Sequence, residues 1–223
     1  NRITARDGIT QISISANTVN NNLVNLGDEN NKINSGFTYF NNNSFTTGSG
    51  DDIVKLKSIN ISSANQSTKN NYINFGDGNN NVQLWFKNAS GNKIITGSGN
   101  DVLNIELYNG TNSDVPFNER DVTYTGAGDD TISFSSFHGI LYAGSGNDTI
   151  KVGYTENIIY AGAGDDTIEF LDSTRVKVNN NSYNYLYYGL GDGKDTVIDH
   201  TGYNRVVFKD LTTKDFIIQK ATN

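Results

Sequence analysis

The chain lacks several residue types on which other protein classes depend. Its 223 residues contain no cysteine, no methionine and a single proline. Without cysteine there is no disulfide framework, so a version of this chain outside the cell must be stabilised in another way. No apolar run approaches the ~18 residues of a transmembrane helix. The nucleophile–base pairs of many enzymes require histidine or cysteine, and this chain has two histidines and no cysteine. We therefore expect no catalytic residues and no enzymatic activity.

Basic residues are also scarce. Seventeen Lys and Arg face 24 Asp and Glu, which gives a net charge of −7 and a pI near 4.7. This balance argues against nucleic acid and anionic membranes as partners and favours a cation ligand, and we expect no membrane insertion. The sequence opens at Asn1 without a methionine or the apolar stretch of a signal peptide, so we expect a fragment of a longer polypeptide.

Asparagine and glycine are abundant instead. The chain has 35 Asn and 23 Gly, whereas hydrophobic residues make up 35%. Asn and Gly tolerate positive φ and favour tight turns, so many short strands around a narrow core are expected.

A nine-residue pattern recurs eight times. The clear copies are GSGDDIVKL (48–56), GSGNDVLNI (97–105), GAGDDTISF (126–134), GSGNDTIKV (144–152), GAGDDTIEF (162–170) and GDGKDTVID (191–199), and the weaker ones are GDENNKINS (27–35) and GDGNNNVQL (76–84). Successive copies begin 18, 21, 28 or 29 residues apart. We interpret 18 as the natural period and the longer intervals as the same coil with surface insertions, the larger of which fall in 57–71, 106–120 and 171–184.

Two apolar columns follow this period. Six residues after each first motif residue stand Ile33, Val54, Val82, Leu103, Ile132, Ile150, Ile168 and Val197, and three residues before it stand Val24, Phe45, Ile73, Ile94, Thr123, Leu141, Ile159 and Leu186. Two residues beyond the first column, another set alternates with polar positions: Leu56, Leu84, Ile105, Phe134, Val152 and Phe170. Alternation of this kind predicts strands with one buried face.

The fold class predicted is therefore all-β, a right-handed parallel β-roll of about eight coils stacked ~4.8 Å apart. We assign 1–198 to the roll, with 1–21 as a degenerate first coil, and 199–223 to a C-terminal cap. Ile12 and Ile14 lie 21 residues before Ile33 and Ser35, which places the degenerate coil in register.

The two turns of each coil differ in chemistry. The fifth motif residue is Asn31, Asp52, Asn80, Asp101, Asp130, Asp148, Asp166 and Asp195, and the equivalent residue of the opposite turn is Asn22, Asn43, Asn71, Asn92, Asp121, Gly139, Asn157 and Asn184. One edge is thus an Asp column. The other is largely an Asn column, which we interpret as a ladder of amide hydrogen bonds.

Stacked carboxylates repel one another unless a cation lies between them. Oxygen ligands without His or Cys select calcium over zinc or copper, and the glycines let backbone carbonyls point to the same spot. A single copy would be read as an ordinary solvated Asx-Gly turn. Eight copies in phase with matched apolar columns favour a calcium file instead.

The chain resembles the RTX family of haemolysin-type calcium-binding repeats, G-G-x-G-x-D-x-U-x, through Gly162, Gly164, Asp166, Ile168 and their counterparts over roughly 22–199. The stretch 188–218 also looks like the segment that often closes such rolls. The resemblance implies metal binding at Gly48, Gly50, Asp52, Gly97, Gly99, Asp101, Gly126, Gly128, Asp130, Gly144, Gly146, Asp148, Gly162, Gly164, Asp166, Gly191, Gly193 and Asp195.

This chain departs from the family pattern in three ways. The family's first Gly is replaced by Thr47, Phe75, Thr96, Thr125, Ala143 and Ala161, where we expect the backbone to matter more than the side chain. The copies at 27 and 76 carry Asn31 and Asn80, and only one edge carries the motif. We therefore expect a single file of Ca²⁺, strongest at Asp101/Asp130, Asp130/Asp148, Asp148/Asp166 and Asp166/Asp195. Within GAGDDTIEF, Asp166 is the expected ligand and Asp165 a bystander in solvent.

The resemblance implies a type I-secreted, extracellular bacterial protein that folds on calcium outside the cell. The leading interpretation is a structural module of a cell-surface protein, of S-layer or adhesin type. The alternative is the folding and secretion module of an RTX toxin or secreted hydrolase. Self-association or a cell-surface glycan are possible partners. A glycan would bind along a tyrosine stripe, Tyr124, Tyr142, Tyr160 and Tyr187, although such a stripe also serves to stiffen a sheet. His138 and His200 are expected in solvated or capping roles.

Overall fold

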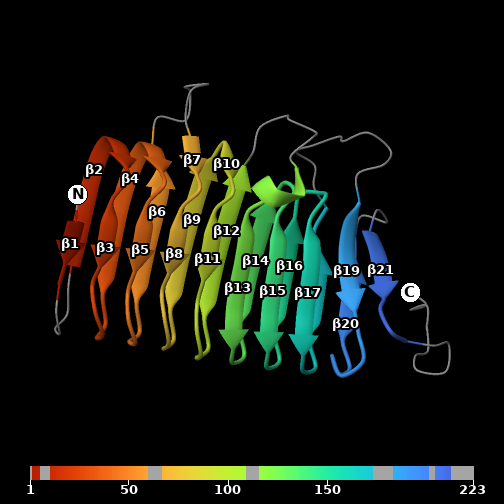
Figure 1. The fold of residues 1–223 in the computed structure, drawn as a ribbon. Helices are drawn as coiled ribbons and strands as arrows, with labels where there is room; N and C mark the ends of the chain where they lie inside the picture. Colours follow the sequence, from red (N-terminus) through yellow and green to blue (C-terminus); the bar gives the residue numbers. More distant parts are fainter. Residues whose placement is uncertain are drawn as a thin grey trace.

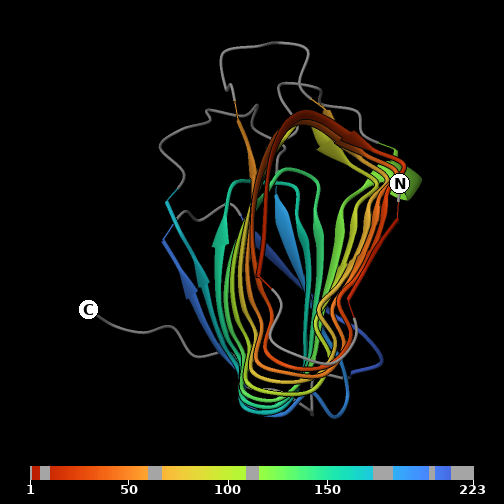
Figure 2. The same ribbon diagram turned by 90° about the vertical axis from the view of Figure 1, so that its left-hand side faces the viewer.

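The structure is a computed structural model that describes residues 2–5, 11–59, 67–108, 116–172, 183–200 and 204–211. Strands that follow one another along the chain alternate between two parallel sheets, so the molecule is a flattened solenoid (Figures 1 and 2). In Figure 1 the stack runs from β1 near the N-terminus to β21 near the C-terminus. The predicted all-β fold with two stacked parallel sheets is confirmed.

The first sheet contains ten of the described strands. In spatial order they are β1 (Arg2–Thr4), β3 (Leu23–Asn25), β5 (Ser44–Thr46), β8 (Tyr72–Asn74), β11 (Lys93–Ile95), β13 (Val122–Ala127), β15 (Ile140–Ser145), β17 (Ile158–Ala163), β19 (Asn184–Tyr188) and β21 (Asn204–Phe208). Each strand pairs with the equivalent strand of the next coil, so residues at the same position of successive repeats lie side by side.

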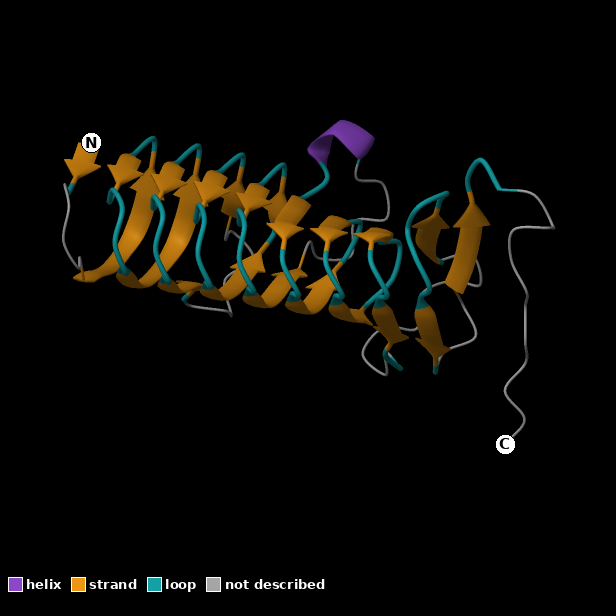
Figure 3. Cartoon of the chain, turned by 90° about the horizontal axis from the view of Figure 1, so that it is seen from below, coloured by secondary structure: helices purple, strands orange, loops and turns teal. Residues whose placement is uncertain are grey.

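The second sheet contains the other half of each coil. Its order is β10 (Ala89–Ser90), β7 (Ser67–Lys69), β4 (Lys32–Asn41), β6 (Ile53–Ser58), β9 (Asn81–Lys87), β12 (Val102–Tyr108), β14 (Thr131–Ser136), β16 (Thr149–Gly153), β18 (Thr167–Phe170) and β20 (Thr196–Asp199), with β2 (Gln11–Asn20) paired to β4. A short 3-10 helix, η1 (Phe117–Glu119), precedes β13. Figure 3 shows the turns linking the two sheets coil after coil.

The core lies between the sheets and follows the predicted columns. Fifteen of the sixteen positions in the two columns are buried, as are all six of the additional set. The exception is Val197, which is 41% exposed. It belongs to β20, the last strand of its sheet among the described residues, so its outer side has no paired strand there. Stacking by the next coil is what buries each apolar side chain.

The coils of the N-terminal half are built differently from the prediction. The three extra residues of a 21-residue interval are not a surface insertion: β2 and β4 each run for ten residues and pair from Gln11↔Lys32 to Asn20↔Asn41. The longer strand gives room for additional aromatic core. Phe37 and Phe40 stack with ring centroids 4.3 Å apart, and Phe86 packs 5.8 Å from Phe37. The larger insertions fall partly outside the described residues.

The two ends of the roll follow the repeat. Ile12 pairs with Ile33 and Ile14 with Ser35, so the degenerate first coil is in the predicted register. At the other end β21 pairs in parallel with β19, so the first sheet continues to Phe208. The division into a roll and a C-terminal cap stays a prediction, because 212–223 lie outside the described residues.

The residue before the first motif glycine is part of the core in seven of the eight copies, whereas Leu190 before Gly191 is 79% exposed. These side chains therefore matter more than we expected from the sequence. Seven such side chains are buried: Leu26, Thr47, Phe75, Thr96, Thr125, Ala143 and Ala161. The threonines also link neighbouring coils. Thr96 Oγ1 donates to the carbonyl of Thr125 at 2.7 Å, and Thr125 Oγ1 donates to that of Ala143 at 2.6 Å. An inward side chain therefore stands at this position in seven of the eight coils.

Candidate metal centre

The glycine-rich turns stack so closely that side chains are excluded from them. Gly128, Gly146 and Gly164 have φ of 129°, 129° and 142°, which L side chains rarely adopt. A Cβ at Gly164 would lie 1.8 Å from the carbonyl oxygen of Gly146 in the preceding coil. Glycine at this position thus allows carbonyl oxygens to lie between the coils.

The Asp column forms a buried hydrogen-bonded ladder along these turns, which we call the inner ladder. Asp52, Asp101, Asp130, Asp148 and Asp166 are each at most 1% exposed. Every Oδ1 accepts a hydrogen bond from the backbone N–H of the equivalent residue in the preceding coil. The N–H groups of Asp101, Asp130 and Asp148 lie 2.8 Å from the Oδ1 atoms of the next residue in the column. The inner ladder runs unbroken from Asn31 to Asp195.

The residues expected to be bystanders form an outer ladder of opposite direction. Asp165 is exposed, as predicted, but its Oδ1 accepts from the backbone N–H of Lys194 in the following coil at 2.9 Å. Asp129 Oδ1 likewise accepts from the N–H of Asn147 at 2.7 Å. The adjacent acids of the motif therefore bind backbone amides of different coils, one behind and one ahead.

The second oxygen of each inner Asp has no partner. The Oδ2 atoms of Asp52, Asp101, Asp130, Asp148, Asp166 and Asp195 are buried and accept no hydrogen bond. Such atoms are costly unless something compensates them.

The two asparagines of the inner ladder show what surrounds these atoms. Asn31 Nδ2 donates to the carbonyl of Glu29 at 2.8 Å, and Asn80 Nδ2 donates to that of Gly78 at 3.1 Å. The equivalent carbonyl in an Asp coil belongs to the third motif residue, such as Gly146 for Asp148. The Asn Nδ2 group points its hydrogens at this carbonyl oxygen. At the same place the Asp Oδ2 atom has only lone pairs, so two oxygens face each other. A proton or a cation must therefore accompany it.

Burial alters the protonation of the inner ladder. It raises the pKa of Asp101 to about 6 and those of Asp148 and Asp195 to about 7, and neighbouring Asp residues add to the rise. The same cause raises the pKa values of Asp52, Asp130 and Asp166. The ionised column is thus unfavourable by itself, which is the electrostatic condition that a bound cation relieves.

The donor set fits a hard cation. In the described part of the chain no three His, Cys, Asp or Glu side chains converge on one point. A cation here would therefore combine one or two carboxylates with backbone carbonyls, the ligand chemistry of calcium. The turns bring together the glycines and aspartates that the sequence predicted as ligands. Gly191 is less enclosed, since a Cβ there would meet nothing within 4 Å.

The opposite edge carries the Asn ladder that the sequence predicted. Asn71 Oδ1 accepts from both the backbone N–H and the Nδ2 of Asn43, and Asn71 in turn donates twice to Asn92 Oδ1. Asn92 donates in the same way to Asp121, whose carboxyl is buried. Burial raises the pKa of Asp121 to about 7. The amides satisfy one another, so this edge has the character of a structural ladder.

The tyrosine stripe lies on the outer face of the first sheet and stacks upon itself. Ring centroids of Tyr124, Tyr142, Tyr160 and Tyr187 are 4.9, 4.6 and 5.0 Å apart in succession. The ring faces of Tyr142 and Tyr160 are thus covered by their neighbours. This arrangement favours a stiffening role over stacking of sugar rings on the stripe.

The histidines differ from each other. His138 is 6% exposed and contacts Glu156, so of the two expected roles, solvated or capping, the solvated one is wrong for it. His200 is exposed and lies 3.2 Å from Glu169 Oε1. In the described part of the chain, no helix is long and apolar enough to span a membrane.

A scan of protein-family models, a search of curated proteins and a search of solved structures each found no match to the chain. The resemblance to RTX repeats thus depends on the motif itself. What the structure supports is a parallel β-solenoid with a buried Asp ladder along one edge.

Proposed function

We propose that this chain is a calcium-stabilised structural module. Calcium ions bind in single file along the inner ladder, between the Asp Oδ2 atoms and the carbonyls of the glycine turns. The folded roll binds the metal and the unfolded chain does not, so binding contributes directly to folding.

The observation that carries the proposal is the difference between Asn and Asp at one position. The amides of Asn31 and Asn80 donate to turn carbonyls, whereas six Asp Oδ2 atoms in the same column have no donor. A divalent cation satisfies the carboxylate and the carbonyl together.

The setting follows from the RTX resemblance and the composition. We propose an extracellular bacterial cell-surface protein, secreted by a type I system and folded by the calcium it meets outside. Cysteine is absent, and calcium takes the stabilising role that disulfides have in many secreted proteins.

Circular dichroism in chelator and in millimolar calcium tests the proposal. We expect a largely unstructured chain in chelator and β signal on addition of calcium, with magnesium much less effective because it requires a tighter octahedral site. The same folded spectrum in both conditions would contradict it.

A triple variant sharpens this test. Asp130→Asn, Asp148→Asn and Asp166→Asn together supply the amides that Asn31 and Asn80 already use. We expect this variant to fold in chelator and to bind fewer calcium ions by isothermal titration calorimetry. Asp165→Asn, in the outer ladder, is the control and should leave calcium binding unchanged. Undiminished calcium binding by the triple variant would exclude the inner ladder as the site.

A further inference from the structure

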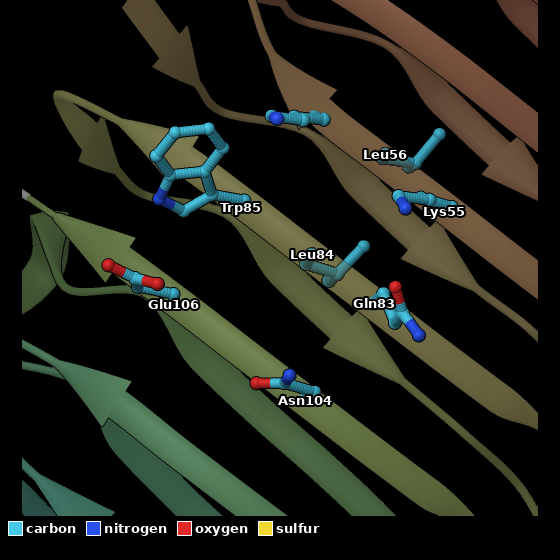
Figure 4. Close-up of a pocket in the computed structure, with 8 residues that line it drawn as sticks. Lys55, Leu56, Gln83, Leu84, Trp85, Asn104 and Glu106 are labelled. Carbon is cyan, nitrogen blue, oxygen red and sulfur yellow. The ribbon is translucent and has the colours of Figure 1, made fainter. Parts of the chain in front are cut away.

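A second candidate site lies on the outer face of the second sheet, away from the glycine turns. Trp85 on β9 is the only tryptophan of the chain. Around it lies a hollow of about 190 Å³ whose polar lining comes from Lys55, Lys57, Gln83, Asn104 and Glu106 on three adjacent strands (Figure 4).

The sheet register arranges these side chains in two rows. Lys55, Gln83 and Asn104 stand side by side in one row. Lys57, Trp85 and Glu106 form the other. The second row is flanked by smaller residues on the neighbouring strands. Gly36 pairs with Lys57 on one side, and Ser135 pairs with Glu106 on the other. Long polar and aromatic side chains are therefore gathered over β6, β9 and β12.

The fold has no need of Trp85 at this place. The core face of β9 is completed by Val82, Leu84 and Phe86, each at most 2% exposed. Trp85 itself is only partly buried on the opposite face. A large aromatic side chain there adds a surface whose use lies outside the packing of the roll.

Neighbouring contacts hold the hollow in shape. Lys57 Nζ lies 4.5 Å from the centroid of the Trp85 ring, a cation–π contact. Glu106 Oε1 accepts a hydrogen bond from the Tyr154 hydroxyl at 3.3 Å. Gln83 extends from the same strand as the indole, two residues before it, and Asn104 extends from the adjacent strand β12 (Figure 4). An aromatic surface bordered by amides, ammonium groups and a carboxylate is therefore preorganised.

We propose that this hollow binds a pyranose ring of a carbohydrate chain. A pyranose presents C–H groups on its faces, which pack on an aromatic surface, and hydroxyls at its edge, which pair with amide and charged side chains. The hollow offers both chemistries at adjacent positions. The stacked Tyr142 and Tyr160 on the other sheet offer only ring edges, so the Trp85 face suits a sugar better than the tyrosine stripe does.

The intrinsic fluorescence of the single tryptophan tests this. We expect saturable changes in Trp85 emission when the calcium-loaded, folded chain is titrated to millimolar concentration with a neutral β-1,4-glucan oligosaccharide or an oligogalacturonate. Binding of the neutral probe assigns recognition to the ring and its hydroxyls. Preference for the acidic probe assigns part of it to Lys55 and Lys57.

Variants locate the site. By isothermal titration calorimetry Trp85→Ala should abolish binding and Gln83→Ala should weaken it at least about tenfold, whereas Tyr142→Ala should leave it unchanged. All three should retain the circular dichroism spectrum in calcium. The proposal would be overturned if neither probe bound. It would also be overturned if Tyr142→Ala abolished binding and Trp85→Ala did not. Neither result would bear on calcium, because the site shares no residue with the inner ladder.

Discussion

One side-chain atom separates the two kinds of turn in this molecule. Asn80 and Asp101 stand in the same column and accept the same backbone hydrogen bond through Oδ1. Only the other atom differs: Nδ2 of Asn80 has an acceptor, whereas Oδ2 of Asp101 has no donor. At the residue scale, the choice between amide and carboxylate decides whether a turn closes by itself or requires a cation.

Asp121 gives a test of pH dependence away from the proposed metal site. Its folded-state pKa of about 7 lies above the usual value near 4. Its contribution is therefore fully present below about pH 4 and is lost as the pH rises through 7. Asp121→Asn keeps the acceptor for Asn92 and removes this loss, so we expect it to raise the free energy of unfolding at pH 8 by about 1–3 kcal/mol.

The measurement is chemical denaturation of both proteins from pH 5 to pH 8 at fixed calcium concentration. The gain should shrink towards pH 5, and the exposed Asp165→Asn should show none. An equal effect at both pH values would show that Asp121 does not titrate in this range.

Gly164 tests the closeness of the stacked turns. Gly164→Ala would place a Cβ 1.8 Å from the Gly146 carbonyl at a φ of 142°. We expect a loss of about 2–4 kcal/mol in the free energy of unfolding, the sum of backbone strain and overpacking. Gly191→Ala is the matched control, because its φ of 98° is also positive but nothing lies within 4 Å of the added atom. It should lose about 1 kcal/mol. Equal losses by chemical denaturation would mean that the coils do not stack as described.

At the scale of elements, each coil is held to the next by side-chain ladders as well as by strand pairing. The sequence alone predicted the strands, the inward columns and the amide character of the Asn edge, because all of these repeat with the motif. It did not predict the ten-residue strands β2 and β4, since an interval of 21 is compatible with a loop or with a longer strand. It also missed the outer ladder, because spacing does not reveal which coil's amide Asp165 reaches. Trp85 was missed because it occurs once and no repeat points to it.

Asn71 shows how much one member of the Asn ladder contributes. It accepts two hydrogen bonds from Asn43 and donates to the carbonyl of Phe40 at 2.7 Å, all buried. Asn71→Ala leaves these groups unpaired, and we expect a loss of about 3 kcal/mol in the free energy of unfolding. Asn34→Ala, on the exposed face of β4, should change it by less than about 0.5 kcal/mol. A loss at Asn71 no larger than that at Asn34 in calcium-containing denaturant titrations would contradict the ladder.

At the scale of the whole molecule, stability depends on position along the stack because each coil contacts only its neighbours. Val82 and Val197 occupy the same column, yet Val82 is fully buried and Val197 is 41% exposed. Val82→Ala should lower the free energy of unfolding by about 2–3 kcal/mol and Val197→Ala by less than about 1 kcal/mol. Chemical denaturation in calcium measures both. A larger loss at Val197 would show that β20 is covered in solution.

The inner and outer ladders also limit how the number of residues in such a chain can change during evolution. Between Gly126 and Gly162, the paired residues of neighbouring strands and the linked residues of the inner ladder lie 18 positions apart. A gene segment encoding 144–161 could therefore be duplicated or deleted, and the donors of the paired strands and of the inner ladder would still face acceptors of the same kind. Duplicating or deleting only nine residues, half a coil, would instead place an Asn turn next to a glycine turn. Within this stretch, a change of length that preserves the ladders is therefore a whole coil of 18 residues.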